Sequence, residues 1–380
     1  MKLMHLSDLH LGKRLIEVSM LEDQAHMLNQ IVGIAREERP QAVLIAGDIY
    51  DRSNPPAEAM TLFARFLRDL TDLGCHVMAI SGNHDSPERI AYLGELVSRQ
   101  GVHLSPVYDG RLASVRLEDE FGPVCFWLMP FIHPDAVRPF FPDEAISGAN
   151  DAVRLVLQEA EVDPSCRNVI LSHQFIAGSA FDDRDQKAVG TLDNVDPSLY
   201  DAFDYAALGH IHRAQNVGRA DGTMRYCGTM LKYSRAEASA EKTVTLVDLG
   251  PRGEVLASAR PLRPLRELRA VKGTFEDLLS RGPEKGQEDD YYFITLTDEI
   301  DPQNAAARLR ERYARLLSLD YDNSRTRAGA MLNLSETGSI SRSPMDMLAE
   351  LYQLTHGRKM SAEALDFARR MIAETEGFEE

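Results

Sequence analysis

Cysteine is rare in this sequence, and none of the cysteines are paired. Four occur in 380 residues, and no two of them form a C-x-x-C motif: Cys75, Cys125, Cys166 and Cys227. This spacing excludes a zinc site built on paired thiolates, and it excludes a disulfide scaffold. We therefore expect the four to be buried thiols in a reducing compartment.

Long apolar runs are also lacking. No apolar stretch approaches the roughly 20 residues that a membrane-spanning helix needs. The first residues, Met1–His5, lead directly to Asp8 without the apolar region of a signal peptide. We therefore expect a cytoplasmic protein that does not associate with membranes.

Basic residues are outnumbered by acidic ones. The chain has 42 Lys and Arg against 59 Asp and Glu, and its formal net charge is −17. Because Lys and Arg supply most of the affinity for phosphate backbones, this balance argues against avid nucleic-acid binding by the chain alone. For a nuclease, part of the acidic excess would be metal ligands, and a partner subunit is one source of a basic surface. The apolar content of 44% indicates a genuine core, and the length predicts two or three domains.

The stretch Val43–Asp51, VLIAGDIYD, organises the N-terminal half of the chain. Val43–Ala46 is typical of a central strand that is buried on both faces of a parallel sheet. Gly47 allows a sharp turn, so Asp48 comes at the carboxyl end of the strand, where α/β proteins build their sites.

Strands and helices alternate around this stretch. Lys2–Leu6 and His76–Ile80 are further predicted strands, and the segments Met20–Glu37 and about 55–73 are predicted helices. This order predicts a parallel sheet with helices on both faces. Later predicted strands are Asn168–Leu171, Tyr205–Leu208 and Thr243–Leu249.

The composition divides the chain into three predicted regions. Residues 1–258 form the first domain. Residues 259–341 comprise a Pro- and Arg-rich connector, Ala259–Gly273, and a small β-α-β domain with its helix at Asn304–Leu317. Residues 342–380 form two C-terminal amphipathic helices.

Polar side chains with oxygen or nitrogen donors follow the predicted strands. They are Asp8, His10, Asp48, Asn83, His173, His210 and His212. Singly, such an Asp ordinarily caps a helix and such a His is ordinarily structural. Together, seven donors without sulfur match the needs of two divalent ions that share one carboxylate.

The motifs resemble the calcineurin-like metallophosphoesterase superfamily, and more closely its bacterial SbcD nuclease subunits. The resemblance rests on SDLHLGK at Ser7–Lys13, AGDIYDRSNPP at Ala46–Pro56, ISGNHDSPER at Ile80–Arg89 and DYAALGHIHRAQ at Asp204–Gln215. It implies an α/β fold in which a sandwich of β-sheets is flanked by helices, followed by a small α+β capping domain and C-terminal helices.

The resemblance also implies a role for each donor. One ion would be held by Asp8, His10, Asp48 and His212, and the other by Asp48, Asn83, His173 and His210. His84 would bind neither ion; it would protonate the leaving 3′ oxygen or stabilise the charged phosphorane. Asp51 is a departure, since archaeal and eukaryotic relatives have a second histidine there, although an aspartate fits the bacterial branch.

The implied activity is hydrolysis of DNA phosphodiesters with two Mn²⁺ ions, Mg²⁺ being the alternative. It comprises 3′–5′ exonuclease cleavage of double strands and endonuclease cleavage of single strands and hairpins, in DNA repair, recombination and replication. The implied partners are DNA and an SbcC-type ATPase, bound through the C-terminal helices, with a homodimer of the subunit inside a heterotetramer.

Several assignments have alternatives. Lys13, Arg14 and Arg89 are candidates for contacts with a DNA backbone, or they are ordinary solvated side chains. The same two readings apply to the regularly spaced Arg260, Arg263, Arg266, Arg269 and Lys272. A stand-alone phosphatase or cyclic-nucleotide phosphodiesterase is the second hypothesis, and a non-catalytic scaffold is the third. The C-terminal helices argue against the second, and the complete set of donors argues against the third.

Overall fold

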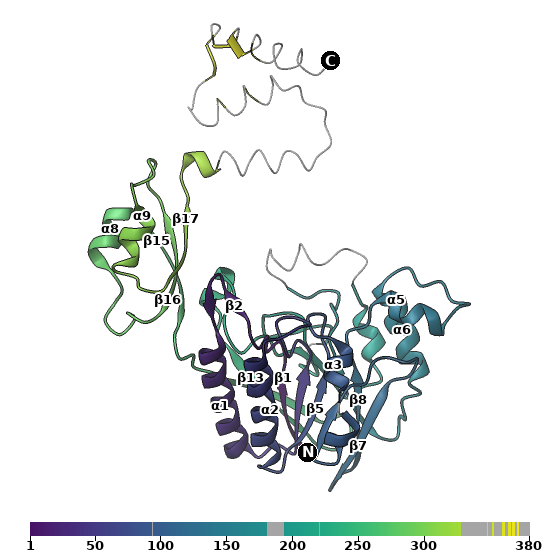
Figure 1. Ribbon diagram of the computed structural model, residues 1–380. Coiled ribbons are helices and arrows are strands. Elements are labelled where there is room, and N and C mark those ends of the chain that lie inside the picture. Colours follow the sequence, from purple (N-terminus) through teal and green to yellow (C-terminus); the bar gives the residue numbers. More distant parts are fainter. Residues whose placement is uncertain are drawn as a thin grey trace. The chain divides into compact units, whose positions relative to one another are not determined.

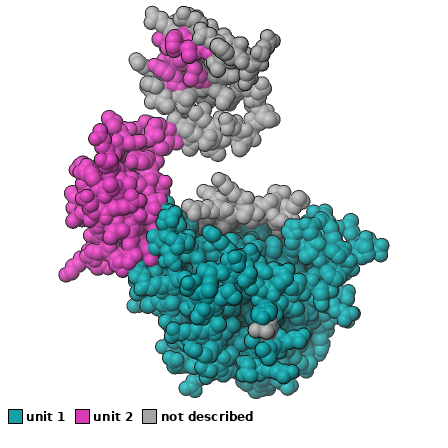
Figure 2. All heavy atoms as spheres, in the orientation of Figure 1, with its two compact units in different colours: residues 1–266 teal, residues 267–380 magenta. Residues whose placement is uncertain are grey.

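The computed structural model describes residues 1–92, 94–180, 194–219 and 221–327, together with scattered residues between 348 and 371. The chain divides into two compact units, Met1–Arg266 and Glu267–Glu380 (Figure 2).

Two six-stranded sheets form the first unit. The first sheet has the order β14 (Val255–Pro261), β13 (Thr243–Leu249), β1 (Lys2–Leu6), β4 (Ala42–Ala46), β5 (His76–Ile80), β6 (Val102–Leu104). The second has the order β11 (Gln215–Asn216), β12 (Met224–Tyr226), β10 (Tyr205–Leu208), β9 (Arg167–Ser172), β8 (Gly122–Met129), β7 (Ala113–Asp119). Strands β1, β4, β5 and β6 are parallel, as are β8, β9, β10 and β12.

The two sheets pack face to face around one apolar core. Leu44 and Met78 of the first sheet lie in the same buried cluster as Phe126, Leu171 and Tyr205 of the second. Helices α1 (Leu21–Glu38) and α2 (Ala57–Thr71) lie side by side along the first sheet (Figure 1). Helix α6 (Ala149–Glu159) packs on the outer face of the second sheet.

This arrangement confirms the predicted sandwich and corrects one detail. Every residue of β4 is buried, as the apolar run at Val43–Ala46 predicts. The prediction of helices on both faces of the first sheet is wrong, because its inner face packs against the second sheet. Periodicity alone cannot separate these two covers, since either one makes a strand apolar on both sides.

Short elements complete the first unit. They are β2 (Arg14–Leu15), β3 (Val18–Ser19), α3 (Pro87–Ala91), α4 (Gly94–Ser98), α5 (Pro134–Val137) and the 3-10 turns η1 (Arg138–Phe140), η2 (Pro197–Tyr200) and η3 (Arg235–Ser239). None of the helices in the described part of the chain is both long and apolar enough to cross a membrane.

The second unit contains a three-stranded parallel sheet and two short helices. The elements are β15 (Leu268–Gly273), α8 (Phe275–Arg281), β16 (Tyr291–Leu296), α9 (Ala305–Arg310) and β17 (Leu316–Tyr321), and β16 is the central strand. Phe275 and Leu309 of the helices share an apolar core with Tyr292 and Ile294 of that strand. The predicted helix at Asn304–Leu317 is too long, because the chain turns after Arg310 and enters β17.

The predicted boundaries differ from those of the structure. The first unit extends to Arg266 rather than 258, because β14 pairs with β13 along its whole length. The segment Ala259–Gly273 is therefore not a connector: it holds the end of β14 and all of β15. Most of the predicted C-terminal helices, at 342–380, lie outside the described residues.

Candidate metal centre

The carboxyl ends of five parallel strands bring the predicted donors together. Asp8 and His10 follow β1, Asp48 follows β4, and Asn83 follows β5 in the first sheet. The second sheet contributes His173 at the end of β9, and His210 and His212 after β10. Parallel strands place their carboxyl ends at one edge, so each sheet presents its donors on one side.

Hydrogen bonds between the sheets fix this edge. The backbone N–H of His210 donates to Asp8 Oδ1 at 3.0 Å, and Nδ1–H of His173 donates to the carbonyl of Ala46 at 2.7 Å. Within the first sheet, the backbone N–H of His10 donates to the carbonyl of Asp48 at 3.0 Å. The candidate metal ligands therefore also form the hydrogen bonds that connect the loops on which they lie.

The backbone is strained at four of the candidate ligands. Asp8, His10, Asp48 and His210 have positive φ angles of 52°, 45°, 48° and 103°. Non-glycine residues rarely adopt this region, and where they do the strain commonly marks a functional site.

Glycines allow the loops to approach so closely. A Cβ on Gly82 would collide with Asp48, and a Cβ on Gly209 would collide with the carbonyl of Ala46. Both positions therefore require glycine, since a larger residue would push a ligand-bearing loop away from its neighbour.

Asp48 lies at the centre of the donors. Its Oδ2 is 3.6 Å from His10 Nε2 and 3.4 Å from His173 Nε2. On one side, Nε2 of His10 faces Nε2 of His212 at 3.1 Å. On the other side, Oδ1 of Asn83 is 3.1 Å from His173 Nε2. The carboxylate thus lies between the two donor groups that the resemblance implies.

His210 completes the second group. Its Nδ1 is 3.1 Å from Asn83 Oδ1, so one amide oxygen faces the imidazoles of both His173 and His210. Asp8, His10, Asp48 and His173 are buried, whereas Asn83 and His84 are exposed. The four buried residues therefore form a floor that is shielded from water, and the two exposed residues lie at the mouth of the site, which is open to solvent.

Burial and neighbouring charges shift the pKa values of the buried residues in the site. Burial raises the pKa of Asp8 to about 7, and the nearby Asp48 carboxylate adds to that shift. Burial opposes ionisation of Asp48, but the adjacent His173 and His10 hold its pKa well below the usual range. Burial likewise disfavours the charged form of His173, yet Asp48 raises its pKa to about 9.

Burial favours the neutral form of three further imidazoles, those of His10, His210 and His212. Burial lowers the pKa of His210 to about 3 and that of His212 to about 4, and it lowers the pKa of His10 well below its ordinary value. A neutral imidazole is the form that binds a metal ion.

The donor set fits divalent cations. Three groups of ligand atoms lie within 4.8 Å of one another: Asp8 with His10 and His212, His10 with Asp48 and His84, and Asp8 with Asp48 and His173. Imidazole nitrogen and carboxylate oxygen without thiolate suit Mn²⁺, Mg²⁺ or Zn²⁺.

His84 is held at the mouth of the site. Its backbone N–H donates to Asp48 Oδ1 at 2.9 Å, and its Nδ1–H donates to the carbonyl of Asp51 at 2.9 Å. Its Nε2 is therefore on the side of the ring that faces Asp48, 4.0 Å from Oδ2. The side chain is 41% exposed, so an incoming substrate can reach it.

Asp85 has a structural role that the motif alone does not reveal. Its carboxylate accepts hydrogen bonds from the backbone N–H groups of Ile49, Tyr50 and Gly82, at 3.0, 2.9 and 2.9 Å. It joins the loop after β4 to the loop after β5. Burial raises the pKa of Asp85 to about 6, with the Asp48 charge as a second cause.

Two carboxylate–lysine pairs behind the site were not predicted. Glu237 pairs with Lys242 at 2.6 Å, and Asp51 pairs with Lys13 at 2.5 Å. No strand-end pattern marks Glu237 or Lys242, because their position near His212 depends on the loop between β12 and β13.

Each of the three candidate DNA contacts has a polar partner within the chain. Lys13 is committed to Asp51 and also lies over the ring of Tyr233. The exposed Arg14 donates to the carbonyl of Glu17, and Arg89 donates to Asn54 Oδ1 at 3.3 Å.

Comparisons with known proteins agree with this geometry. The profile of the calcineurin-like phosphoesterases matches residues 1–214. A second profile, SbcD_C, described as the type 5 capsule protein repressor C-terminal domain, matches residues 262–356. The SbcD subunit of the nuclease SbcCD from Staphylococcus epidermidis is 29% identical over 323 residues, which are 84% of this chain and 85% of that protein.

Two solved structures show a more distant similarity. A dimetal phosphatase from Danio rerio covers 68% of this chain and 96% of its own, with 13% identity and a TM-score of 0.39. The protein TT1561 of Thermus thermophilus covers 68% and 98%, with 13% identity and a TM-score of 0.39.

The profile that matches residues 1–214 covers more than half of the chain. It confirms the predicted fold class and the prediction of a metal-dependent hydrolase of phosphoesters. The resemblance to SbcD subunits is confirmed by the similarity along both units. The chain belongs to the calcineurin-like phosphoesterase family.

Proposed function

We propose that the chain is the nuclease subunit of an SbcCD-type complex and hydrolyses DNA phosphodiesters with two divalent ions, of which Mn²⁺ is the one expected in use. The observation that carries the proposal is the convergence of six further donors around Asp48. The similarity to the Staphylococcus epidermidis nuclease subunit extends over 84% of the chain and supports a nucleic acid as substrate.

The ligand sets follow the two sides of Asp48. Asp8, His10 and His212 share one ion with Asp48, and Asn83, His173 and His210 share the other. When bound, the two ions neutralise phosphodiester oxygens and lower the pKa of the attacking water. The buried floor excludes bulk water from the ligands, which strengthens the electrostatic interactions in the site.

His84 is the residue assigned to proton transfer. The carbonyl of Asp51 fixes Nδ1–H, so Nε2 is the nitrogen available to a substrate. In the protonated imidazole, Nε2–H donates to the leaving 3′ oxygen or to the charged phosphoryl group. His84 is not assigned as a ligand, because its side chain is 41% exposed and, with Nδ1–H bound to the Asp51 carbonyl, its Nε2 is open to an incoming substrate.

DNA-end and hairpin cleavage in repair, recombination and replication, the SbcC-type ATPase as partner, and a homodimer within a heterotetramer belong to the same proposal. The second profile, at residues 262–356, supports the shared architecture with SbcD subunits. The proposed docking segment, residues 342–380, lies for the most part outside the described residues, and a cytoplasmic location stays a prediction.

The test is digestion of an end-labelled DNA hairpin and of a labelled duplex with Mn²⁺ or Mg²⁺, with and without the partner ATPase. The wild-type chain should open the hairpin in Mn²⁺, and the Asp48→Asn variant should not. Cleavage of small phosphodiesters such as bis-p-nitrophenyl phosphate, with no DNA cleavage under any condition, would instead favour a stand-alone phosphodiesterase.

A further inference from the structure

Each of the two histidines on one side of Asp48 has a carboxylate–lysine pair behind it. Nδ1 of His212 is 3.9 Å from Oε1 of Glu237, whose other oxygen is 2.6 Å from the Lys242 ammonium. Nδ1 of His10 is 3.7 Å from Oδ1 of Asp51, to which the Lys13 ammonium is bound at 2.5 Å. In both cases the opposite nitrogen, Nε2, points into the site, where His10 and His212 face each other at 3.1 Å.

The pair of Glu237 and Lys242 is held in place by several hydrogen bonds. Lys242 donates to Glu237 Oε2 at 2.6 Å, to Thr229 Oγ1 at 2.6 Å and to the backbone carbonyl of His212 at 3.1 Å. An ammonium group has three N–H donors, and all three are used. Oε1 of Glu237 accepts from the hydroxyl of Ser234 at 2.8 Å, so this carboxylate cannot rotate freely.

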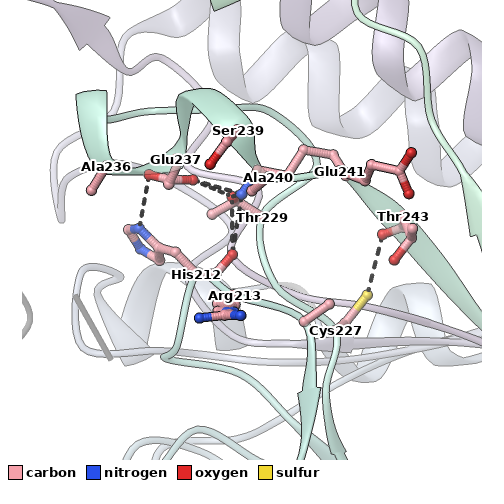
Figure 3. A pocket seen from close by; sticks show the side chains of 12 residues that line it. His212, Arg213, Cys227, Thr229, Ala236, Glu237, Ser239, Ala240, Glu241 and Thr243 are labelled. Atoms are coloured by element: carbon pink, nitrogen blue, oxygen red, sulfur yellow. Dashed lines mark hydrogen bonds and ion pairs between the residues drawn. The ribbon is translucent and has the colours of Figure 1, made fainter. Parts of the chain in front are cut away.

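A cavity of about 430 Å³ borders this pair, and Glu237 and Lys242 line it together with His212 and Thr229. Figure 3 shows the Glu237 carboxylate turned towards the imidazole of His212. The carboxylate of Glu241 points away from both. Glu237 is 4% exposed, whereas Glu241 is an exposed residue of the same loop.

A contribution to fold stability does not explain well why the Glu237–Lys242 pair is buried. Desolvating a carboxylate and an ammonium group generally offsets their attraction, and apolar residues of the same size often stabilise a fold equally well. A buried pair that touches both the ring and the backbone carbonyl of a candidate ligand is better explained by its effect on that ligand.

Of the two histidines on the other side of Asp48, His173 is supported differently. Nδ1–H of His173 donates to the backbone carbonyl of Ala46, which is uncharged. A carboxylate behind a metal-bound imidazole fixes its tautomer and raises its basicity more than a neutral acceptor does. The two proposed ion sites therefore differ in the charge behind their ligands.

We propose that Glu237 and Asp51, each clamped by its lysine, are positioning residues that hold His212 and His10 with Nε2 towards the ion. They make the site of Asp8, His10 and His212 the tighter of the two. At 3.9 and 3.7 Å the attraction is electrostatic, and each lysine keeps its carboxylate aimed at the ring instead of at the ion. This inference rests on the proposed two-ion function.

The test is calorimetric titration of the metal-free, full-length chain with Mn²⁺ alone. The wild type should bind two ions with unequal affinity. Glu237→Gln and Asp51→Asn should each weaken the tighter step by about 10- to 100-fold and leave the weaker step unchanged. Glu241→Gln, the matched control on the same loop, should bind both ions as the wild type does.

The visible absorption spectrum of the Co²⁺-loaded chain gives a second readout. The bands of the tighter site should shift in Glu237→Gln and Asp51→Asn, and not in Glu241→Gln. Because Asp51 is paired with the partly exposed Lys13, Asp51→Asn keeps the test decisive if Glu237→Gln does not fold. Folded variants with both Mn²⁺ affinities unchanged would overturn the inference. A wild-type chain that binds no Mn²⁺ would instead overturn the proposed function.

Discussion

At the scale of single residues, the two proposed functions of the site, metal binding and proton transfer, are assigned to different residues, Asp48 and His84. Asp48 holds both donor groups, since its Oδ2 faces His10 on one side and His173 on the other. The backbone N–H of His84 hydrogen-bonds to Asp48, whereas its partly exposed imidazole is only 4.0 Å from the Asp48 carboxylate and makes no hydrogen bond to it. Metal binding and proton transfer are therefore expected to fail independently.

The first prediction concerns this separation. His84→Ala should retain two bound Mn²⁺ ions and lose activity by on the order of 10²–10⁴, the range for general acid–base catalysis. Asp48→Asn should weaken both ions, because one carboxylate serves both sides. Metal content by elemental analysis, together with turnover of a labelled hairpin, tests the pair of variants. Loss of an ion in His84→Ala would make His84 a ligand and refute its assignment.

The second prediction concerns pH. The pKa of His173 is raised to about 9 by Asp48, and that of Asp8 is raised to about 7 by burial, so near neutral pH the metal-free chain has His173 protonated and Asp8 protonated in part. Since a metal binds only their deprotonated forms, binding must release protons. Mn²⁺ affinity should therefore rise from about pH 6 to about pH 8. Titrations in buffers with different heats of ionisation count the protons, and binding at pH 7 without any proton release would contradict the prediction.

At the scale of elements, the sequence predicts most of what is local. A buried strand followed at once by polar residues is a local pattern, and β1, β4, β5, β9 and β10 all show it. The donors at their ends could be named for the same reason. The carboxylate–lysine pairs could not, since Glu237 reaches His212 only after the loop between β12 and β13 has folded.

Strand β15 is a local element that the sequence analysis missed, because it took this segment for a connector. Its residues alternate between inner and outer faces, but Arg269 and Lys272 disguise that pattern. In the structure Arg269 is neutralised by Asp290 at 2.6 Å, and Lys272 pairs with Asp322. A charged residue whose partner is distant in sequence suggests a solvent-exposed connector, because the sequence alone does not show that the fold brings the partner close.

The third prediction tests the close approach of the two sheets. Gly209→Ala should displace the carbonyl of Ala46, which holds His173, because the new Cβ would collide with it. Overpacking of this kind costs about 1–3 kcal/mol. We expect a lower Tm and loss of the ion that His173 holds, measured by calorimetry and Mn²⁺ titration.

The matched control is Gly33→Ala in α1, where an added Cβ meets nothing within 4 Å. Alanine there should leave both ions in place and stabilise the helix by up to about 1 kcal/mol. Equal Tm values and equal Mn²⁺ binding in Gly209→Ala and wild type would show that the loops can move apart, against the prediction.

At the scale of the whole molecule, the net charge of −17 limits how the chain meets DNA. Several arginines that follow β13 are engaged within their own units. Arg260 pairs with Glu37 at 3.1 Å, and Arg266 pairs with Asp23 at 3.0 Å. Charges held in this way neutralise fewer phosphates, so the affinity for DNA is expected to come largely from a partner.

The fourth prediction concerns that partner and residues 343–380. Met345, Leu348, Leu351 and Tyr352 recur at helical spacing, as do Leu365, Ala368 and Ile372, so each set predicts one apolar stripe. Two short helices gain too little from burying such stripes against each other, which favours docking into a partner's groove. Deletion of 343–380 should leave a folded chain that binds Mn²⁺ and cleaves small phosphodiesters, because every proposed ligand lies before residue 213. The truncated chain should lose binding to the ATPase and, with it, ATP-stimulated DNA cleavage. A pull-down with purified ATPase measures the first effect, and full retention of affinity would exclude the docking role.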